Sequence, residues 1–387
     1  MAKTVFSSER TDPYSPPVEH LQLQAEQPVA CLDWPGRGEI WTVTKHEDVR
    51  TVLVDTRFSS DREDPRHPAH VAYNPATHHG QLIEMDPPVH TTLRGRIMNE
   101  FTVKRIAAMR PKIEQVVSDA IDAMLASGNE GDLVALLALP VPSLVIGDLL
   151  QVPDEDHVFF QEHSAKFSGE GTQAERIEAI TAIRSYIAGM VDARIATPGD
   201  DILSRQLAAG STREEVIGLG FLLLIAGHET TANQIALSIM TLLDKPELMQ
   251  QLCDDISLVP NAVEELLRYF TIAESGGLRL ALADIEVNGV TIPEGATVWA
   301  LENTANRDPE VFPDPHKIDF TRGARNHVAF GFGPHQCLGQ NVARLELVVV
   351  LEEVVKRLPN LRLTVPVSEL TFKNMGNFGP HKLPVAW

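Results

Sequence analysis

One segment near the carboxy-terminal end restricts the possible folds of this chain more than any other. It reads Phe330-Gly-Phe-Gly-Pro-His-Gln-Cys-Leu-Gly339, and a long helical pattern follows it directly. This order predicts a glycine-rich loop that ends at the N-terminus of a helix over about 338–358. A thiol at that position meets unpaired N–H groups and the positive end of the helix dipole, and both favour a thiolate. The glycines around Cys337 remove side-chain bulk, so a flat, wide partner would fit against the backbone.

Cys337 has three possible roles. Most lone cysteines inside cells are small buried hydrophobes without chemistry. A hydrolytic nucleophile requires a base beside the sulfur, and His335, only two residues away in the sequence, does not replace the usual remote partner. The glycine-rich context therefore favours the third role, that of a ligand to a cofactor.

The longest apolar stretch predicts a helix over about 212–243 that crosses the centre of the protein. Its start, Thr212-Arg-Glu-Glu215, has the pattern of a capping box. The segment Ala226-Gly-His-Glu-Thr-Thr231 places a glycine in mid-helix at a cost of about 1 kcal/mol relative to alanine, which close approach of a ligand would explain. His228 and Glu229 do not begin a zinc-protease motif, because Ala232 stands where the second histidine would be. The glutamate–threonine pair inside so apolar a run indicates a function rather than ordinary solvation.

Patterns along the remaining chain predict a mainly α protein with a smaller β-rich region, an α+β class. The first thirty residues are proline-rich and are expected to follow the surface, with regular structure starting near Glu39. We expect all of 1–387 to form one domain. Its β-rich portion is predicted at about 30–60 and 275–300 and in C-terminal strands, and its helical portion at about 88–270 and 338–358.

Composition excludes several functions. The formal net charge of −20 argues against nucleic-acid binding, because a phosphate backbone would repel so acidic a surface. Three widely spaced cysteines argue against a disulfide framework and for a reducing compartment. The first residues contain no secretory signal, and the run 216–227 is about half the roughly 20 residues of a membrane-spanning helix. A cytoplasmic protein without a membrane partner is expected.

The cysteine loop resembles the haem-binding signature of the cytochrome P450 family, Phe-Gly-x-Gly-x-His/Arg-x-Cys-x-Gly, at every defined position. The resemblance implies haem b as cofactor, with Cys337 as the axial ligand of the iron. It also implies that His335 faces a haem propionate and that Phe330 packs near the sulfur, with Gly339 completing the loop. The implied fold has a long central helix over the haem.

Other segments match the same family in the same order. The central helix is similar to the family's oxygen-binding groove, which implies that Ala226 and Gly227 line the haem and that Glu229 and Thr230 manage protons. His90 and Arg94, four residues apart on one predicted helix face, and Arg279 match further propionate-binding positions; each is otherwise an ordinary solvent-facing residue. Three more residues match a buried structural ion network, and they are Glu265, Arg268 and Arg322.

The resemblance implies a monooxygenase that uses dioxygen and two externally supplied electrons to oxidise a small organic substrate, most similar to soluble actinobacterial members. A ferredoxin and its reductase are the expected electron donors, and a monomer is expected. A docking role or a merely solvated face would both explain the basic cluster of Arg94, Arg96, Lys104, Arg105, Arg110 and Lys112. The donor-rich segment 62–85 indicates either a polar substrate or a solvated loop. The alternatives for the whole chain are a peroxide-driven haem peroxygenase and a haem-based sensor.

Overall fold

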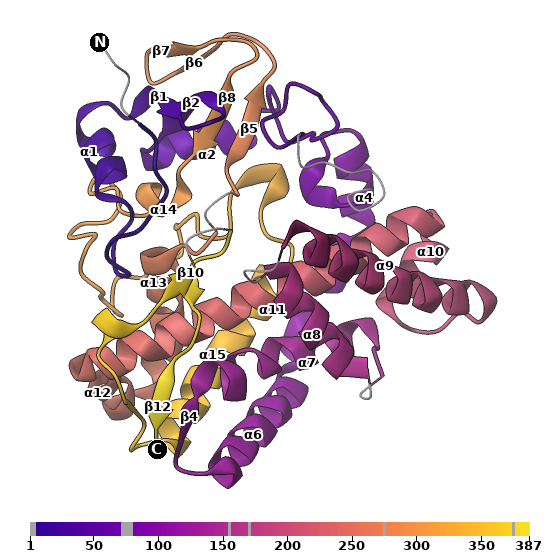
Figure 1. Ribbon diagram of the computed structural model, residues 1–387, viewed down its shortest axis with the longest axis vertical. Helices are drawn as coiled ribbons and strands as arrows, with labels where there is room; N and C mark the ends of the chain where they lie inside the picture. Colours follow the sequence, from indigo (N-terminus) through magenta and orange to yellow (C-terminus); the bar gives the residue numbers. More distant parts are fainter. Residues whose placement is uncertain (1–4, 71–79, 154–155, 169–171, 274–275, 374–375) are drawn as a thin grey trace.

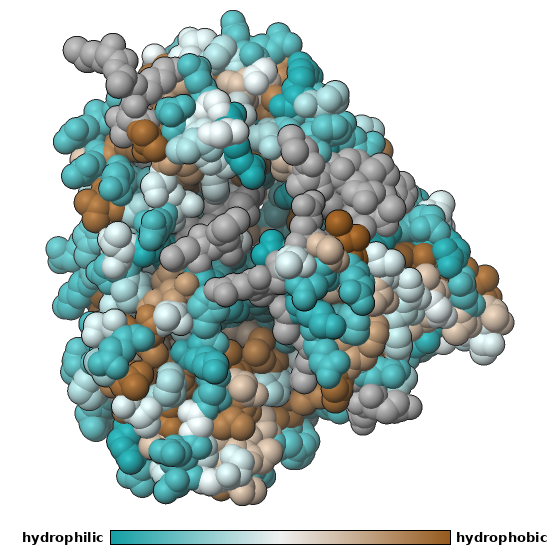
Figure 2. Space-filling model, viewed as in Figure 1, coloured by the Kyte–Doolittle hydropathy of each residue, from teal (hydrophilic) through white to brown (hydrophobic). Residues whose placement is uncertain are grey.

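A computed structural model describes residues 5–70, 80–153, 156–168, 172–273, 276–373 and 376–387. Most of the labelled strands lie at the top of Figure 1, a few C-terminal ones lie in its centre and lower part, and helices fill most of the lower and right-hand parts. This arrangement confirms the predicted α+β class, with helices dominating. Figure 2 shows the same face, on which hydrophilic and hydrophobic residues are intermixed.

Most of the helices lie within the predicted helical portions at 88–270 and 338–358. The first half of the chain contains α1 (Val18–Glu26), α2 (His46–Val54), α4 (Val89–Ile97), α5 (Val103–Ala108), α6 (Arg110–Ser127), α7 (Pro140–Leu150), α8 (His157–Ser168) and α9 (Gln173–Ala196). The second half contains α10 (Ile202–Ala208), α11 (Arg213–Asp244), α12 (Pro246–Asp254), α13 (Val259–Phe270), α14 (Glu302–Ala305) and α15 (Gln340–Arg357).

The largest sheet among the described residues joins strands from both ends of the sequence. Its order is β1 (Val29–Trp34), β2 (Gly38–Val43), β8 (Thr297–Ala300), β5 (Leu278–Ala281) and β3 (Phe58–Ser59). All its pairs are antiparallel except β2 with β8, where Thr42 lies opposite Trp299. The sheet therefore brings Arg279 on β5 into the same region as the amino-terminal strands.

Smaller strand pairs complete the β structure. The hairpin of β6 (Ile285–Val287) and β7 (Val290–Ile292) turns at Asn288-Gly289, as the sequence predicts. The C-terminal segment forms β9 (Arg362–Leu363), β10 (Phe372–Lys373), β11 (Gly379–Pro380) and β12 (Pro384–Ala386), and β12 lies between β9 and β4 (Glu130–Asp132). In Figure 1, β10 lies in front of the central helix α11.

Helix α11 forms the centre of the main hydrophobic core. Thr212 and Glu215 form the predicted capping box, in which each side chain bonds the backbone of the other residue. By length and composition alone the helix would cross a membrane, but 61% of its most apolar window is buried inside the fold. This burial is what we expect of a core helix, and the prediction of a buried helix is confirmed.

The prediction for the first residues was wrong. Helix α1 and strand β1 precede Glu39, where regular structure was expected to begin. The buried side chains of α1 are the polar residues His20 and Gln24, so this helix has no apolar stripe that a periodicity argument could detect. Gln24 instead donates to the carbonyl oxygens of Thr44 and Thr304, each at 2.8 Å, which ties the helix to the rest of the fold.

Candidate active site

The cysteine loop has the compact shape that its glycines predict. The N–H of Cys337 donates to the carbonyl oxygen of Phe330 at 2.8 Å, which closes the loop. Gly331 and Gly333 have φ values of 70° and 71°, a left-handed conformation that favours glycine. A side chain at Gly333 would lie 2.9 Å from the carbonyl oxygen of Leu53 on α2. The loop is therefore fixed in shape and is pressed against α2.

The chemistry of the Cys337 thiol departs from the prediction. Helix α15 begins at Gln340, two residues later than expected. Burial raises the pKa of the thiol, although the backbone N–H groups of Gly339 and Gln340 and the charge of Arg94 act to lower it. The predicted helix N–H groups do reach the sulfur, but loss of hydration outweighs them. A cation bound to this sulfur would act in the same direction as these N–H groups and favour the thiolate.

A buried ion network lies behind the loop. Glu264 on α13 accepts from Arg344 on α15 at 2.7 Å and pairs with His327 at 3.1 Å. The guanidinium carbon of Arg344 lies 4.5 Å from the centre of the Phe330 ring. Burial acts to raise the pKa of Glu264, but the hydrogen bonds from His327 and Arg344 outweigh it and hold the pKa at about 2. The network anchors the phenylalanine that begins the loop.

Four predicted donors converge beside the loop from three different elements. The rings of His90 on α4 and His335 in the loop lie 4.1 Å apart, and Arg94 donates to the carbonyl oxygen of Gln336. Arg279 on β5 is buried and donates to the carbonyl oxygen of Leu278 at 2.8 Å. Burial, together with the neighbouring Arg279, His90 and Arg94, lowers the pKa of His335 to about 3. The structure thus concentrates positive charge and hydrogen-bond donors in one buried region.

This region fits the carboxylates of a haem. Both ring nitrogens of His90 are buried without a hydrogen-bond partner among the described residues. Asp86 and Glu302 lie near enough to raise the pKa of Arg279, but burial outweighs them and lowers it. An unpaired buried donor costs about 1–3 kcal/mol, so an acceptor such as a propionate would satisfy it. The thiol of Cys337 keeps an exposed surface although protein surrounds it, as expected of a side chain that faces a space inside the protein.

The central helix presents a small, accessible surface in the middle of its buried length. Ala226 is exposed although the residues before it are buried, and Thr230 donates from Oγ1 to the carbonyl oxygen of Ala226 at 2.6 Å. A side chain at Gly227 would point at Ile146 on α7, 3.2 Å from its Cδ1. Packing of α7 against α11 is therefore one reason for the glycine, and the predicted approach of a ligand to this residue stays a prediction. The carboxylate of Glu229 accepts from Lys373 on β10 at 2.8 Å.

The predicted structural ion network is present. Arg268 and Glu265 are fully buried and joined by two hydrogen bonds of 2.8 Å, and Arg322 adds a third bond to Glu265 at 3.1 Å. Arg268 also donates to the carbonyl oxygens of Asn306 and Pro315. These bonds connect α13 to the segment that leads to the cysteine loop.

The basic cluster near α4 to α6 is largely neutralised. Arg94 is turned toward the cysteine loop, Arg96 lies 3.6 Å from Glu215, and Arg105 lies 2.5 Å from Glu100. Arg110 pairs with Glu352 at 2.6 Å, and Lys112 lies 3.6 Å from Asp148. Over the described part of the chain, two of the six form no ion pair: Arg94, which is turned inward, and Lys104, which is exposed.

The donor-rich segment 62–85 uses most of its described donors within the protein. Arg62 pairs with the buried Glu84 at 2.8 Å, and Arg66 pairs with Asp64 at the same distance. His70 bonds the carbonyl oxygen of Arg62. His78 and His79 lie outside the described residues. These contacts occupy most of the described donors that a polar substrate could use, although Nε2 of the buried His67 has no hydrogen-bond partner among the described residues.

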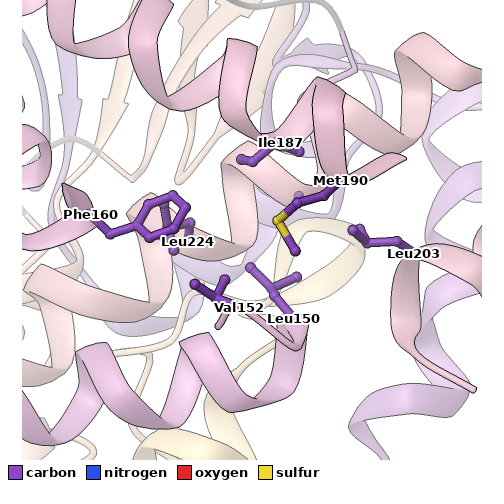
Figure 3. A pocket seen from close by; sticks show the side chains of 8 residues that line it. Leu150, Val152, Phe160, Ile187, Met190, Leu203 and Leu224 are labelled. Carbon is purple, nitrogen blue, oxygen red and sulfur yellow. The ribbon is translucent and has the colours of Figure 1, made fainter. Parts of the chain in front are cut away.

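A separate hollow between helices is entirely apolar (Figure 3). Its lining comes from α7 to α11, the loop after α7 included, and consists of Leu150, Val152, Phe160, Ile187, Met190, Leu203, Gly220 and Leu224. None of these residues carries a polar side chain that would orient a substrate. We therefore place the active site at the cysteine loop and not in this hollow.

Two residues of the candidate site were not identified from the sequence. Glu264 is the first of two adjacent glutamates, and only the second fits the family pattern. Lys373 stands in a short polar strand without a motif. The remaining signal for Glu264 is its position on the same apolar helix as Glu265, which implies burial for both.

Comparison with known proteins agrees with this geometry. The family model described as cytochrome P450 matches residues 200–364. A vitamin D3 dihydroxylase of Streptomyces griseolus is 45% identical over 391 residues, covering 99% of this chain and 96% of that protein. A pentalenic acid synthase of Streptomyces avermitilis is 42% identical, covering 100% of this chain and 98% of that protein. The crystal structure of cytochrome P450 MoxA from Nonomuraea recticatena (CYP105) has a TM-score of 0.92 at 42% identity, covering 99% of this chain and 98% of that one.

The chain therefore belongs to the cytochrome P450 family. Its cofactor is haem b, and it is a monooxygenase, an oxidoreductase that incorporates oxygen from dioxygen into an organic substrate. Soluble bacterial members of the CYP105 type are the relatives that it resembles over its whole length.

Proposed function

We propose that Cys337 is the axial ligand of the haem iron and that His90, Arg94, Arg279 and His335 hold the haem propionates. The observation that carries the proposal is the convergence of these four donors beside the cysteine loop, with the ring nitrogens of His90 buried and unpaired among the described residues. Charge-assisted bonds to carboxylates would satisfy these donors. The accessible thiol, the nearby Arg94 and the absence of a side chain at Gly339 fit a flat cofactor against the loop.

The protein side chains have separate roles in this proposal. Bound haem supplies activation of dioxygen, with electron donation from an axial thiolate favouring cleavage of the O–O bond. Phe330, held by Arg344, packs near the sulfur and limits its access to water. Ala226 and Gly227 would let a bound haem approach the backbone of α11, and Thr230, whose hydroxyl donates to the carbonyl oxygen of Ala226, would lie beside it. Glu229 and Thr230 would be the acid–alcohol pair that moves protons toward bound dioxygen.

The electron donors, the oligomeric state, the domain organisation and the location of the protein are also proposals. We infer a ferredoxin and its reductase as electron donors, a monomeric state, a single domain over 1–387 and a cytoplasmic location. The exposed Lys104 of α5, which has no ionic partner among the described residues, supports an electrostatic contact with an acidic donor. We propose that the substrate is a small organic molecule, similar in size to the molecules named for relatives. One of these relatives has been solved in complex with filipin I.

Replacement of Cys337 tests the ligand assignment directly. We expect Cys337→Ala and Cys337→His to lose the carbonyl spectrum typical of thiolate coordination, with the histidine variant giving one typical of imidazole. Cys253→Ala, at an exposed cysteine of α12, is the matched control and should keep the normal spectrum. An unchanged carbonyl spectrum in Cys337→Ala would disprove the proposal.

Dioxygen-dependent and peroxide-dependent turnover separate the two enzymatic alternatives. We expect product formation with dioxygen and a reductase system to exceed that with peroxide, because the acid–alcohol pair serves the dioxygen route. Turnover with peroxide alone would instead support a peroxygenase. A protein that binds haem but consumes no dioxygen with any donor would support a sensor.

A further inference from the structure

A lysine from the C-terminal hairpin binds the acid of the proposed proton-delivery pair. Lys373 on β10 donates from Nζ to Oε1 of Glu229 at 2.8 Å and to Oδ1 of Asn233 at 3.0 Å. Glu229 and Asn233 lie four residues apart on one face of α11, so the ammonium group bridges a single helical turn. The side chains of Lys373 and Glu229 are only 18% and 14% exposed. This contact is therefore shielded from water, unlike most lysine–glutamate pairs at a surface.

The β10–β11 hairpin is docked on α11 by several bonds around this contact. Lys373 lies opposite Gly379 in the strand pair, and a side chain at Gly379 would lie 2.5 Å from Cγ of Asn233. Asn233 donates in turn from Nδ2 to the carbonyl oxygen of Asn377 at 3.2 Å. The N–H of Phe378 donates to the carbonyl oxygen of Ile272 at 2.8 Å. The glycine permits a close approach that places the lysine at the acid.

The bonds of Glu229 and Thr230 point to a resting arrangement. Oε1 of Glu229 is occupied by the hairpin ammonium, and Oγ1 of Thr230 is occupied by the carbonyl oxygen of Ala226. No hydrogen bond joins Glu229 to Thr230 among the described residues. While the ammonium group holds Oε1, the Glu229 carboxylate is restrained on the side of the hairpin, which limits how far it can turn toward another group. The hairpin and the proton-delivery pair are thus coupled through one ion pair.

We propose that Lys373 is a positioning residue that holds Glu229 against the β10–β11 hairpin, so that release of this contact permits proton delivery. The inference rests on the proposed role of Glu229 and adds that the contact with Lys373 regulates proton delivery by this residue. Displacement of the hairpin would free the carboxylate to turn toward Thr230. With the contact closed, delivery of protons to dioxygen is slow.

Consumption of reductant without substrate provides the test. In this side reaction, dioxygen takes up two electrons and two protons and leaves as hydrogen peroxide. The holoenzyme is assayed with a surrogate ferredoxin system, and both NADPH consumption and peroxide release are followed. We expect Lys373→Met to raise both rates about two- to fivefold, because the loss of one ion pair changes an equilibrium by about this factor. Lys373→Arg, which keeps a cation, should stay near the wild-type rates.

The same substitution in a Glu229→Gln background shows whether Lys373 acts through the acid. We expect Lys373→Met to have no further effect on either rate there. An equal increase in both backgrounds, unchanged rates in Lys373→Met alone, or a decrease in that variant would each overturn the inference.

A double-mutant cycle on chemical denaturation of the same four proteins measures the ion pair without turnover. We expect a favourable coupling between Lys373 and Glu229 in the free energy of unfolding. Additive effects of the two substitutions would overturn the inference, because the ion pair would then contribute nothing to stability. The ferric and carbonyl spectra of each variant confirm an intact haem site. Failure of the proposed function would be seen there and in Cys337→Ala, and is thereby distinguished from failure of the lysine contact alone.

Discussion

His90 and His335 are 245 residues apart in the sequence, and their rings lie 4.1 Å apart in the fold. One comes from α4 and the other from the cysteine loop, and Arg279 on β5 adds its charge to the same place. Burial lowers the pKa of both histidines, so both rings are neutral near pH 7, and each offers one N–H donor. The two rings therefore connect the cysteine loop to helix α4.

Replacement of His90 should weaken haem retention. In His90→Phe, the packing of the ring is kept but the hydrogen bond to a propionate is lost, which costs about 1.5–3 kcal/mol or about 10- to 100-fold in haem affinity. The rate of haem transfer to an excess of a haem-free acceptor protein measures this loss. His20→Phe, at a buried histidine of α1 that stacks on Phe6, is the matched control. Equal transfer rates for the two variants would argue against propionate binding by His90.

Removal of the Thr230 hydroxyl should uncouple dioxygen use from product formation. In Thr230→Ala, we expect the share of electrons recovered in product to fall about tenfold or more, because a positioned proton-transfer group contributes about 10²- to 10⁴-fold. Product and peroxide are quantified per NADPH consumed. Thr230→Ser keeps a hydroxyl at the same position and should retain most of the coupling. Full coupling in the alanine variant would remove Thr230 from the proton path.

The network around Glu264 should make stability depend on pH in acid. Its pKa of about 2 in the fold lies below the ordinary value of 4.5, so the carboxylate contributes stability above about pH 4.5 that is lost as the pH falls toward 2. Glu264→Gln should lower the free energy of unfolding near pH 7 by about 3 kcal/mol, because Arg344 loses its buried partner. Chemical denaturation at a series of pH values measures both effects.

A surface carboxylate supplies the control for that experiment. Glu353 pairs with Lys356 on the exposed side of α15, so Glu353→Gln should change stability by less than about 1 kcal/mol. The difference in stability between wild type and Glu264→Gln should shrink as the pH falls from 4.5 to 2. A difference that stays constant over this range would show that the network does not depend on the charge of Glu264.

Charge reversal at Lys104 should slow reduction by an acidic electron donor. Lys104→Glu changes an exposed side chain without breaking an ion pair in the described structure, whereas Arg105→Glu would place a second carboxylate beside Glu100. We expect the reduction rate by ferredoxin to fall about tenfold at low salt and the difference to diminish at high salt. Stopped-flow reduction measures this, with Lys112→Glu, beside Asp148, as a comparison. Equal rates for Lys104→Glu and wild type would rule out docking at Lys104.

The sequence by itself determined the features that depend on neighbours in the chain. The capping box of α11 follows from two residues that are three apart in the sequence. The glycine pattern of the loop at Cys337 follows from local backbone geometry in the same way. The α+β class and the haem ligand candidate could therefore be predicted before any contact was known. Helix α1 could not, because its buried side chains are polar.

Only the tertiary structure decided which distant residues meet. It neutralised most of the basic cluster with acids from elsewhere, placed Ile146 on α7 against Gly227, and placed Lys373 against Glu229. It also showed that burial, and not the helix N-terminus, dominates the pKa of Cys337. The physical reason is that desolvation and ion pairing depend on distance in space, which packing of the whole chain sets.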